Sequence, residues 1–576
     1  MIRSNKSARF DRWDGIFFLL LLGTAAFFLW RCRYGFANID EAFYPTVPHR
    51  LAQGDRLLMQ EWHLTQLSSV LLYVPVVLYE KLTGGTDGIY LALRHLCVVT
   101  QCLAAAAVYL KTRKYHKPGA AAGALALAVY TPFNINALSY HSLGILFMAF
   151  TGILLAETEE KNRVVFALTG FLFACAVLCS PHLIALYGLY ALAVLLFRKR
   201  RGDLAPLAPE SFAFFTLGAA VCAVLFFFIG LYGADFSGLR KAIHGILTDP
   251  EHSEQTAVGL LIYSMAAYPA RVIVRAGIRP GICMAAVLVL ALIARIDKKR
   301  ERHTAVYLLL GTVLTAAAQI FFYIEQRHPN FFMYAVNLLA LLCVCASPRD
   351  RTARRLMLFW WLPGMAYSFL VVLGSNQGSF VIFSAAASAV PCSMILIFRT
   401  ARSLFPQSTK SIRALTAAAL AALTIVQIGA PAEKRCRYVF WGNEIVHQTV
   451  ELTEGPEKGI IGEPYSTEAY NTVYPVVREL ERRAGDGEVL VLSDKTYLFL
   501  GKFKNAGYSA WLSGVNDTTL ERLALYYEIN PDKLPVLAWT ETENAAYAEK
   551  FADMFGYVCE QTDMGIFLTP KDESLP

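Results

Sequence analysis

Long apolar blocks recur along most of this sequence and constrain its fold more than any other feature. A helix needs about 20 residues to cross the hydrocarbon core of a bilayer, and many of these blocks approach that length. The chain has 576 residues and is 56% hydrophobic, so we predict a polytopic α-helical membrane protein. We expect about 13 transmembrane helices. They are placed near residues 15–33, 88–110, 119–133, 135–155, 164–180, 182–197, 211–232, 281–296, 304–324, 331–346, 356–373, 380–398 and 414–430.

Charge is distributed unevenly between the apolar part of the chain and its C-terminal segment. Residues 431–576 contain 14 Lys and Arg against 24 Asp and Glu, a net charge of −10. The whole chain carries +8, so residues 1–430 carry +18. The bases cluster in alternate connections such as 111–114 and 298–302, as the positive-inside rule predicts for cytoplasmic loops. We therefore expect a multi-pass protein of the plasma membrane with a cytoplasmic N-terminus, and no nucleic-acid partner.

The sequence divides into a transmembrane part, 1–430, and a soluble extracytoplasmic α/β domain, 431–576. No small-x-small cleavage site follows the first apolar run, so we expect it to stay as an anchor. The α/β prediction rests on strand patterns at 488–492, 535–539, 557–559 and 565–568, and on helical patterns at 467–483, 518–527 and 543–555. Cys436 and Cys559 of this segment can pair only if it lies outside the cytoplasm, and the sequence leaves their pairing open.

Two outer loops contain apolar stretches that are too short or too basic to cross the bilayer. The first outer loop, 34–87, includes such a stretch at 67–79, which we predict to be a helix in the membrane interface. The outer loop 233–280 ends with Arg271, Arg275 and Arg279, which form one basic stripe on a predicted interfacial helix.

Two adjacent carboxylates, Asp40 and Glu41, follow the first span closely and begin the first outer loop. Solvated loop residues are the simplest interpretation of such a pair. Its position between the anchor and an interfacial helix, with Arg50 nearby in sequence, favours a functional interpretation.

This layout resembles the GT-C glycosyltransferase superfamily, which contains protein O-mannosyltransferases and the bacterial lipid A aminoarabinose transferase. Members have many spans, an acidic Asp-Glu or Asp-x-Asp motif in the first extracytoplasmic loop, interfacial helices there, and often an external C-terminal domain. The resemblance covers the layout of nearly the whole chain, and Asp40-Glu41 is the short motif that carries it. It implies that Asp40 is the catalytic base and that Glu41 is its companion.

The chemistry of a lipid-linked donor fits so small a motif. A polyprenyl-phosphate sugar contains its own leaving group, so the enzyme needs a base for the acceptor hydroxyl and positive charge for the departing phosphate. Asp40 suits the first task. Arg327-His328-Pro329 closes the span near 304–324 on the outer side, and an Arg can hold a phosphate through two hydrogen bonds. A turn anchored by an interfacial Arg and His is the alternative interpretation.

Other polar residues on the predicted outer side complete the set of candidates. Tyr140 and His141 lie in the turn between the third and fourth predicted spans, where some GT-C members have a second polar or acidic motif. Helix capping and an interfacial Tyr would explain the same residues. Glu41 and His252 are candidate ligands of a divalent metal ion, although their spacing matches no defined site. No nucleotide-binding motif is present in the sequence, so we expect no other cofactor.

We therefore predict an inverting glycosyltransferase of the cell envelope. Its donor would be a polyprenyl-phosphate sugar, its acceptor an extracytoplasmic lipid, glycan or protein hydroxyl, and its substrate-binding residues Glu41, Arg50, Tyr140, His141, Arg327 and His328. The alternatives are a transporter or flippase of a lipid-linked saccharide and a non-catalytic membrane scaffold. A transporter would favour charges inside the spans, where Arg94-His95 is the clearest example and few others occur.

Overall fold

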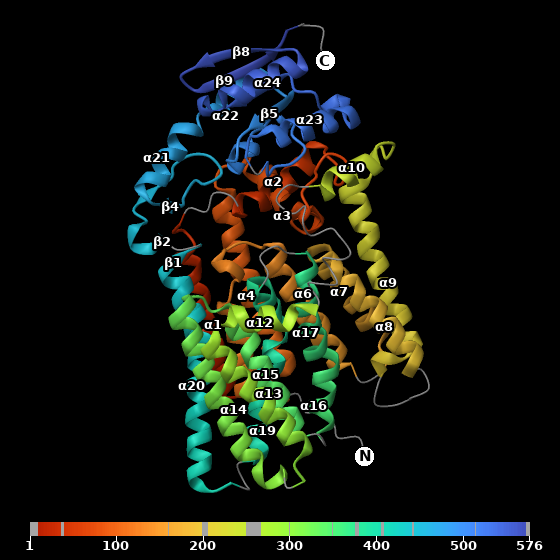
Figure 1. Cartoon of the computed structure of the whole chain (residues 1–576), viewed down its shortest axis with the longest axis vertical. Helices are drawn as coiled ribbons and strands as arrows, with labels where there is room; N and C mark the ends of the chain where they lie inside the picture. The colour runs from red at the N-terminus through yellow and green to blue at the C-terminus, as the bar shows by residue number, and fades with distance from the viewer. Residues whose placement is uncertain are drawn as a thin grey trace.

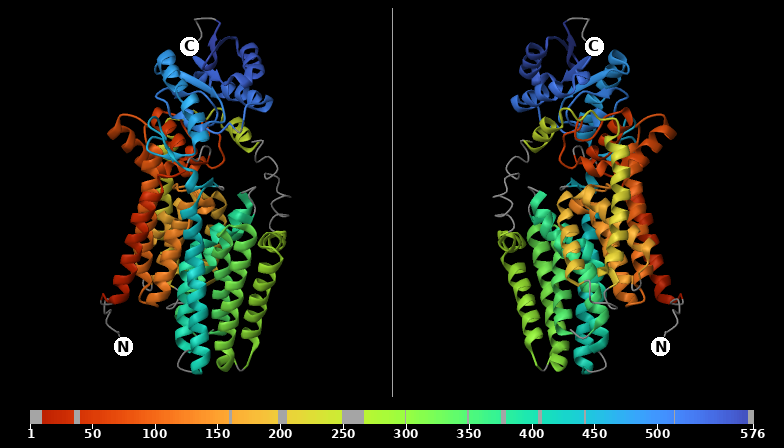
Figure 2. Two further views of the ribbon diagram at one scale, coloured as in Figure 1. Left: turned by 90° about the vertical axis from the view of Figure 1, so that its left-hand side faces the viewer. Right: turned by 90° about the vertical axis from the view of Figure 1, so that its right-hand side faces the viewer.

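The computed structural model shows a long bundle of helices with an α/β unit at one end (Figure 1). The α/β unit lies at the end where the first helix stops, and that helix begins at the opposite end (Figures 1 and 2). The structure describes residues 10–35, 40–158, 161–197, 205–248, 266–298, 300–347, 350–374, 379–404, 408–440, 443–512 and 514–571.

Eight helical segments in the described part of the chain are long and apolar enough to cross a membrane. They comprise all or most of α1 (Arg12–Arg31), α4 (Ile89–Thr112), α6 (Tyr140–Glu157), α9 (Pro209–Phe226), α13 (Ile278–Ile296), α14 (Arg300–Gln326), α19 (Val390–Leu404) and α20 (Lys410–Arg437). The shorter apolar helices include α5 (Lys117–Val129), α7 (Arg163–Cys179), α8 (Ile184–Phe197) and α15 (Asn330–Ala346). The prediction of a polytopic helical protein is confirmed at this level. The total of about 13 spans stays a prediction.

Small residues allow α7 and α9 to pack closely. A Cβ added to Gly170 would lie 1.8 Å from the carbonyl oxygen of Phe215. One added to Gly218 would lie 1.7 Å from that of Ala167. The two backbones are therefore in contact, as is common for helices that pack inside a bilayer, where small residues permit close approach.

A buried carboxylate joins three helices at the end of the bundle away from the α/β unit. Asp14 of α1 accepts hydrogen bonds from the hydroxyl of Tyr109 at 2.8 Å, from Arg113 at 2.6 Å and from Lys117 at 2.7 Å. Arg113 belongs to the basic connection 111–114 that we predicted to be cytoplasmic. Asp14 therefore neutralises part of that basic cluster and fixes the packing of α1, α4 and α5.

The α/β unit is built on a five-stranded sheet with the strand order β6-β5-β7-β9-β8. The strands are β5 (Glu488–Leu492), β6 (Lys504–Asn505), β7 (Leu537–Thr540), β8 (Tyr557–Thr562) and β9 (Gly565–Pro570). β6, β5 and β7 are parallel, whereas β9 runs antiparallel to both β7 and β8. The helices around the sheet are α21 (Pro464–Val473), α22 (Val476–Ala484), α23 (Asp517–Ile529) and α24 (Ala545–Phe555). Cys436 and Cys559 are both free thiols.

The core of the α/β unit also contains residues from the outer loops. The helices α2 (Asp40–Gln53), α3 (Val70–Thr83) and α10 (Leu239–Leu247) lie between the sheet and the bundle (Figure 1). Trp62 is fully buried, and its backbone N–H donates to the carbonyl of Tyr508 at 2.8 Å. Its ring packs edge-on against that of Tyr526, with the ring centroids 5.3 Å apart. The C-terminal segment and the first outer loop therefore share one hydrophobic core.

The outer loop 233–280 contains a second short helix. Arg271 and Arg275 of the predicted basic stripe belong to α12 (Tyr268–Ala276), which lies across the bundle axis next to the start of α13 (Figure 2). This helix ends before Gly277, which has φ +84°, so Arg279 belongs to α13 and the prediction of one continuous helical stripe is wrong. Ile273 and Val274 are exposed at 57% and 75%, and Arg275 is exposed beside them. This pairing of apolar and basic side chains suits a membrane surface.

A buried ion network joins the first outer loop to the α/β unit. Arg50 of α2 donates to Asp55 at 2.7 Å and to Glu61 at 2.8 Å, and its remaining nitrogen donates to the carbonyls of Gln60 and Gly507. Lys533 of the α/β unit contacts the other oxygen of Asp55 at 2.5 Å. Arg50 is fully buried, so every nitrogen of its guanidinium contacts protein groups in this network.

We predict that the substitution Lys533→Met destabilises the junction by roughly 3–5 kcal/mol, because it leaves Asp55 buried without one of its counter-charges. The measurement is the melting temperature of the purified full-length chain. Lys458→Met is the control, because Lys458 is an exposed lysine of the same segment. Equal melting temperatures for the two variants would contradict this role.

Candidate functional site

Asp40 and Glu41 begin α2 but have different surroundings. Glu41 is 3% exposed, and its two oxygens accept hydrogen bonds from Arg94 of α4 at 2.5 and 2.6 Å. Arg94 also donates to the carbonyl oxygens of Cys32 at 2.9 Å and of Gly35 at 2.7 Å. Asp40 is partly exposed. The Arg94–Glu41 pair therefore fixes the start of α2, where Asp40 is the first residue.

The surroundings of Glu41 do not suit its predicted metal role. Arg94 already donates to both carboxylate oxygens of Glu41, and its positive charge disfavours a divalent cation there. The second candidate ligand, His252, lies outside the described residues. Within the described ranges, no group of three His, Cys, Asp or Glu side chains is placed to hold a metal ion.

Tyr44 connects Asp40 with the turn that precedes α6. It lies one helical turn after Asp40, so the two side chains share a face of α2. The ring of Tyr44 lies 6.5 Å from that of Tyr140, and its hydroxyl is hydrogen-bonded to Ser139. Burial raises the pKa of Tyr44 well above its ordinary value, and the charges of Tyr140 and Asp40 raise it further. The ring of His141 lies 4.0 Å from that of Tyr140, and the two rings are tilted by 38°. Tyr44 therefore links the helix that begins at Asp40 to the turn that contains Tyr140.

A group of basic side chains lies at the same end of the bundle. Arg327 is exposed in the turn between α14 and α15, and His328 is buried beside it. Burial, with a smaller effect of Lys434, lowers the pKa of His328 to about 4. Its Nδ1 accepts the backbone N–H of Asn330, so the neutral ring has its proton on Nε2. The ammonium of Lys434 lies 4.1 Å from the ring of Tyr438.

Arg435, the next residue of α20, is buried among polar groups of the preceding helices. It donates to Asn136 at 2.9 Å and to Gln101 at 3.1 Å, and it stacks on Phe28 at 4.0 Å. Its Nη2 has no hydrogen-bond partner among the described residues. Arg31, at the end of α1, donates to the carbonyls of Cys436 and Tyr438. Positive charge therefore accumulates where α1, α14 and α20 end.

Sequence reasoning did not find the contribution of α20. We predicted the last span near residues 414–430 and assigned everything from Pro431 onwards to the soluble domain. In the structure α20 continues through Pro431 to Arg437, so Lys434 and Arg435 belong to the bundle. Arg50, predicted to bind substrate, lies instead in the junction network with Asp55 and Lys533.

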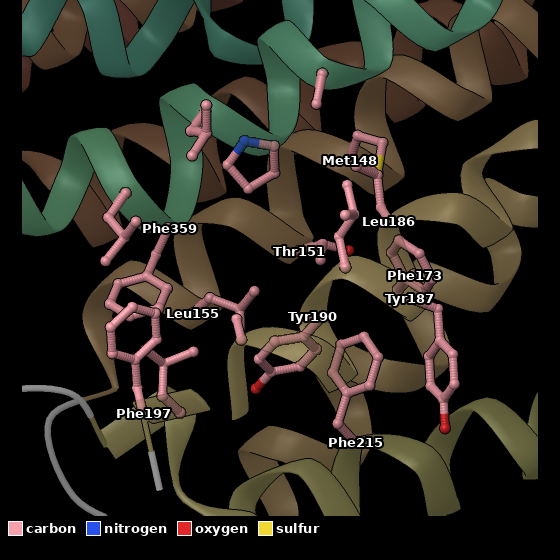
Figure 3. Close-up of a pocket in the computed structure, with 17 residues that line it drawn as sticks. Met148, Thr151, Leu155, Phe173, Leu186, Tyr187, Tyr190, Phe197, Phe215 and Phe359 are labelled. Carbon is pink, nitrogen blue, oxygen red and sulfur yellow. The ribbon is translucent and has the colours of Figure 1, made fainter. Parts of the chain in front are cut away.

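An apolar cavity of about 460 Å³ opens between α8 and the rest of the bundle (Figure 3). Its walls come from α6, α7, α8, α9 and α17 (Leu362–Leu370), and they include Met148, Leu155, Phe173, Tyr190, Ala193 and Phe215. The hydroxyls of the two lining tyrosines are already bonded, Tyr187 with Thr216 and Tyr190 to the carbonyl of Pro206. The cavity therefore offers apolar contacts and little hydrogen bonding.

The helix α6 connects the candidate site with the cavity, because it begins at Tyr140 and its residue Met148 lines the cavity. Met148 lies eight residues after Tyr140 in this helix, which corresponds to about 12 Å along its axis. Leu192 and Leu196 of α8 do not line the cavity and are exposed at 50% and 68%, as expected for side chains that face lipid. A hydrocarbon chain can therefore enter the cavity from the side of the bundle.

Comparisons with known proteins do not identify this site: no protein-family model matches the chain, and no curated protein matches it either. The interpretation of the site rests on its geometry.

The substitution Glu41→Gln should lower the melting temperature, because it leaves Arg94 buried without its counter-charge, at a cost of roughly 3–5 kcal/mol. Asp40→Asn removes a charge from the adjacent, partly exposed position and should leave the melting temperature nearly unchanged. Thermal unfolding of both variants by intrinsic fluorescence tests this difference. Destabilisation by Asp40→Asn as large as that by Glu41→Gln would contradict it.

Proposed function

We propose that this chain is an inverting GT-C-type glycosyltransferase that moves a sugar from a polyprenyl-phosphate donor to an extracytoplasmic hydroxyl acceptor. One observation carries the proposal. Of the two adjacent carboxylates, Glu41 is held by Arg94, whereas Asp40 is partly exposed at the start of α2 beside Tyr44. A partly exposed carboxylate on a fixed backbone suits the role of a general base.

In the proposed reaction, Asp40 accepts the proton of the acceptor hydroxyl while its oxygen attacks the anomeric carbon. The bond between that carbon and the phosphate oxygen breaks, its electron pair stays on the phosphate, and the polyprenyl phosphate leaves. Arg327 and Lys434 supply positive charge for the departing phosphate, and His328 supplies an Nε2–H donor. No general acid is required, because a phosphate is already a good leaving group.

The apolar cavity supports a lipid-linked donor. With the phosphate at the level of Tyr140, the first isoprene units would span the roughly 12 Å to Met148. The following units would then lie between α8 and α17, where the lining is almost entirely apolar. The donor would enter sideways from the bilayer, as its hydrocarbon chain requires.

The arrangement of charges supports an extracytoplasmic site. The helix α2, which begins with Asp40, lies with the α/β unit at one end of the bundle (Figure 1). Arg113 pairs with Asp14 near the start of α1, at the other end. Under the positive-inside rule the second end is cytoplasmic. The proposed total of about 13 spans agrees with this orientation, because an odd number places the two termini on opposite sides.

The transporter and scaffold interpretations have less support. Two polar contacts buried between the helices join neutral groups: Gln319 with Gln427 at 2.6 Å, and Asn337 with Ser393 at 2.5 Å. A transporter of charged lipid-linked saccharides would favour ionisable groups in such positions.

The test of the proposed function compares the wild type with Asp40→Asn. Each purified protein would be incubated with radiolabelled polyprenyl-phosphate sugars and an envelope acceptor fraction. We expect Asp40→Asn to lose roughly 10²–10⁴-fold in transfer rate, the usual contribution of a general base. Asp235→Asn, a change to an exposed outer-loop carboxylate, is the matched control and should keep full activity.

Each outcome of this assay has a distinct meaning. Transfer by both proteins would support the enzyme but remove Asp40 as its base. No transfer by either across a broad donor panel would contradict the proposed function and favour the transporter or the scaffold.

Filling the apolar cavity should affect donors with long lipid chains selectively. The substitution Ala193→Trp puts an indole into the cavity from α8, so we expect the KM for long-chain donors to rise about 10-fold, the effect of losing one or two buried methylenes. Donors with chains too short to reach Met148 should be unaffected. Ala185→Trp, on the exposed face of the same helix, is the control. An equal effect on both donor lengths would exclude the cavity as the lipid site.

A further inference from the structure

A tight loop of the C-terminal segment, residues 452–460, presses against the start of α4. The backbone N–H of Gly88 donates to the carbonyl of Gly455 at 2.9 Å, and that of Tyr90 donates to Pro456 at 3.2 Å. Gly455 has φ +71°, and a Cβ there would lie 2.2 Å from the hydroxyl of Tyr470. The loop is therefore tightly packed, and a shift of its backbone would break its hydrogen bonds to the start of α4.

Glu457, in the middle of this loop, is fully buried. Neither of its carboxylate oxygens has a hydrogen-bond partner among the described residues, and the hydroxyl of Tyr90 lacks one as well. A buried carboxylate without partners is very unfavourable when ionised, because it loses its hydration and gains nothing in return.

The charged and titratable groups that face Glu457 come from four elements. They are Arg94 and Tyr90 of α4, Glu41 of α2, Tyr470 of α21 and Tyr497, which lies in the turn before Leu500. Arg94 already donates to Glu41 and to the carbonyls of Cys32 and Gly35. Burial raises the pKa of Glu457 well above its ordinary value, and the charge of Glu41 raises it further, while Arg94 opposes these effects.

We propose that Glu457 is a neutral acid in the folded protein and that its ionisation is a pH-sensitive release of the C-terminal segment from the Arg94–Glu41 pair. The proton goes to solvent. The new carboxylate then repels Glu41 and competes with it for Arg94, so the contact that fixes the start of α2 and Asp40 weakens. This inference concerns the stability of the junction and does not depend on the proposed glycosyl transfer.

The direction of the pH effect follows from proton linkage. In the unfolded chain a Glu ionises near pH 4.3, whereas in the folded protein Glu457 keeps its proton to higher pH. At pH values between the pKa of Glu457 in the unfolded chain and its pKa in the folded protein, the folded state binds more protons than the unfolded state. The free energy of unfolding therefore decreases as the pH rises through this range. Below about pH 4.3 Glu457 is protonated in both the folded and the unfolded state, so it no longer makes the stability depend on pH. A glutamine at this position does not ionise and removes the effect.

The first experiment measures the melting temperature of the full-length wild type and of Glu457→Gln from pH 5 to pH 9. The variant should match the wild type most closely at pH 5 and exceed it by roughly 1–4 °C at pH 8 to 9. Glu468→Gln, a change to an exposed carboxylate of α21, is the matched control and should follow the wild type at every pH. Parallel curves for the wild type and Glu457→Gln over the whole range would overturn the inference.

A second measurement uses the wild type and therefore does not depend on the folding of a variant. Hydrogen–deuterium exchange, corrected for the intrinsic effect of pH on exchange, should show that amides of residues 452–460 lose protection between pH 6 and pH 9. Peptides that contain the start of α2 should lose protection in parallel. Unchanged protection in both regions would also overturn the inference.

Discussion

The buried contact between Arg94 and Glu41 holds together the end of the helical bundle that lies next to the α/β unit. Removing two charges from water is costly, and an ion pair persists in such a place only when its remaining hydrogen-bonding groups are also satisfied. Arg94 meets this condition through both oxygens of Glu41 and the carbonyls of Cys32 and Gly35. The pair therefore joins the end of α1, the start of α2 and the start of α4, and it determines where Asp40 lies.

The C-terminal segment is packed onto this contact rather than attached by a flexible linker. Glu457 interacts electrostatically with Arg94 and Glu41, and Lys533 completes the separate charge network of Arg50 through Asp55. Trp62 of the first outer loop belongs to the core of the α/β unit. A change in this unit should therefore affect the carboxylate at the start of α2, which gives the unit a role in positioning the proposed base.

Much of the fold could be predicted because it depends on local patterns of hydrophobicity. The apolar blocks correspond to helices, the strand patterns at 488–492 and 565–568 correspond to β5 and β9, and the apolar stretch at 67–79 largely coincides with α3. Such patterns show which face of a helix or strand is buried. Each pattern can be recognised within a few helical turns or a few strand residues. The limits of α20 were less predictable, because the bundle keeps Pro431 inside a helix.

The candidate site was predicted less completely, because its contacts join residues that are far apart in the sequence. Glu41 and Arg94 are 53 positions apart, so no local pattern shows that the second neutralises the first. Arg50 was predicted to bind substrate from its closeness to Asp40 in the sequence. Its position depends instead on Asp55 and Glu61, in a network that Lys533 completes. Asp40, Tyr140 and Arg327 could be proposed because each follows or precedes an apolar block at the same predicted side.

The central claim is that Asp40 and the C-terminal unit form one assembly on the extracytoplasmic side of the membrane. Cys559 of β8 is an exposed thiol of this unit and provides a direct test. Intact cells would be treated with a membrane-impermeant maleimide, with Cys559→Ala as the control. We predict labelling of the wild type without permeabilisation and loss of that label in the variant. Labelling of Cys559 only after permeabilisation would place the unit and Asp40 in the cytoplasm and contradict the account.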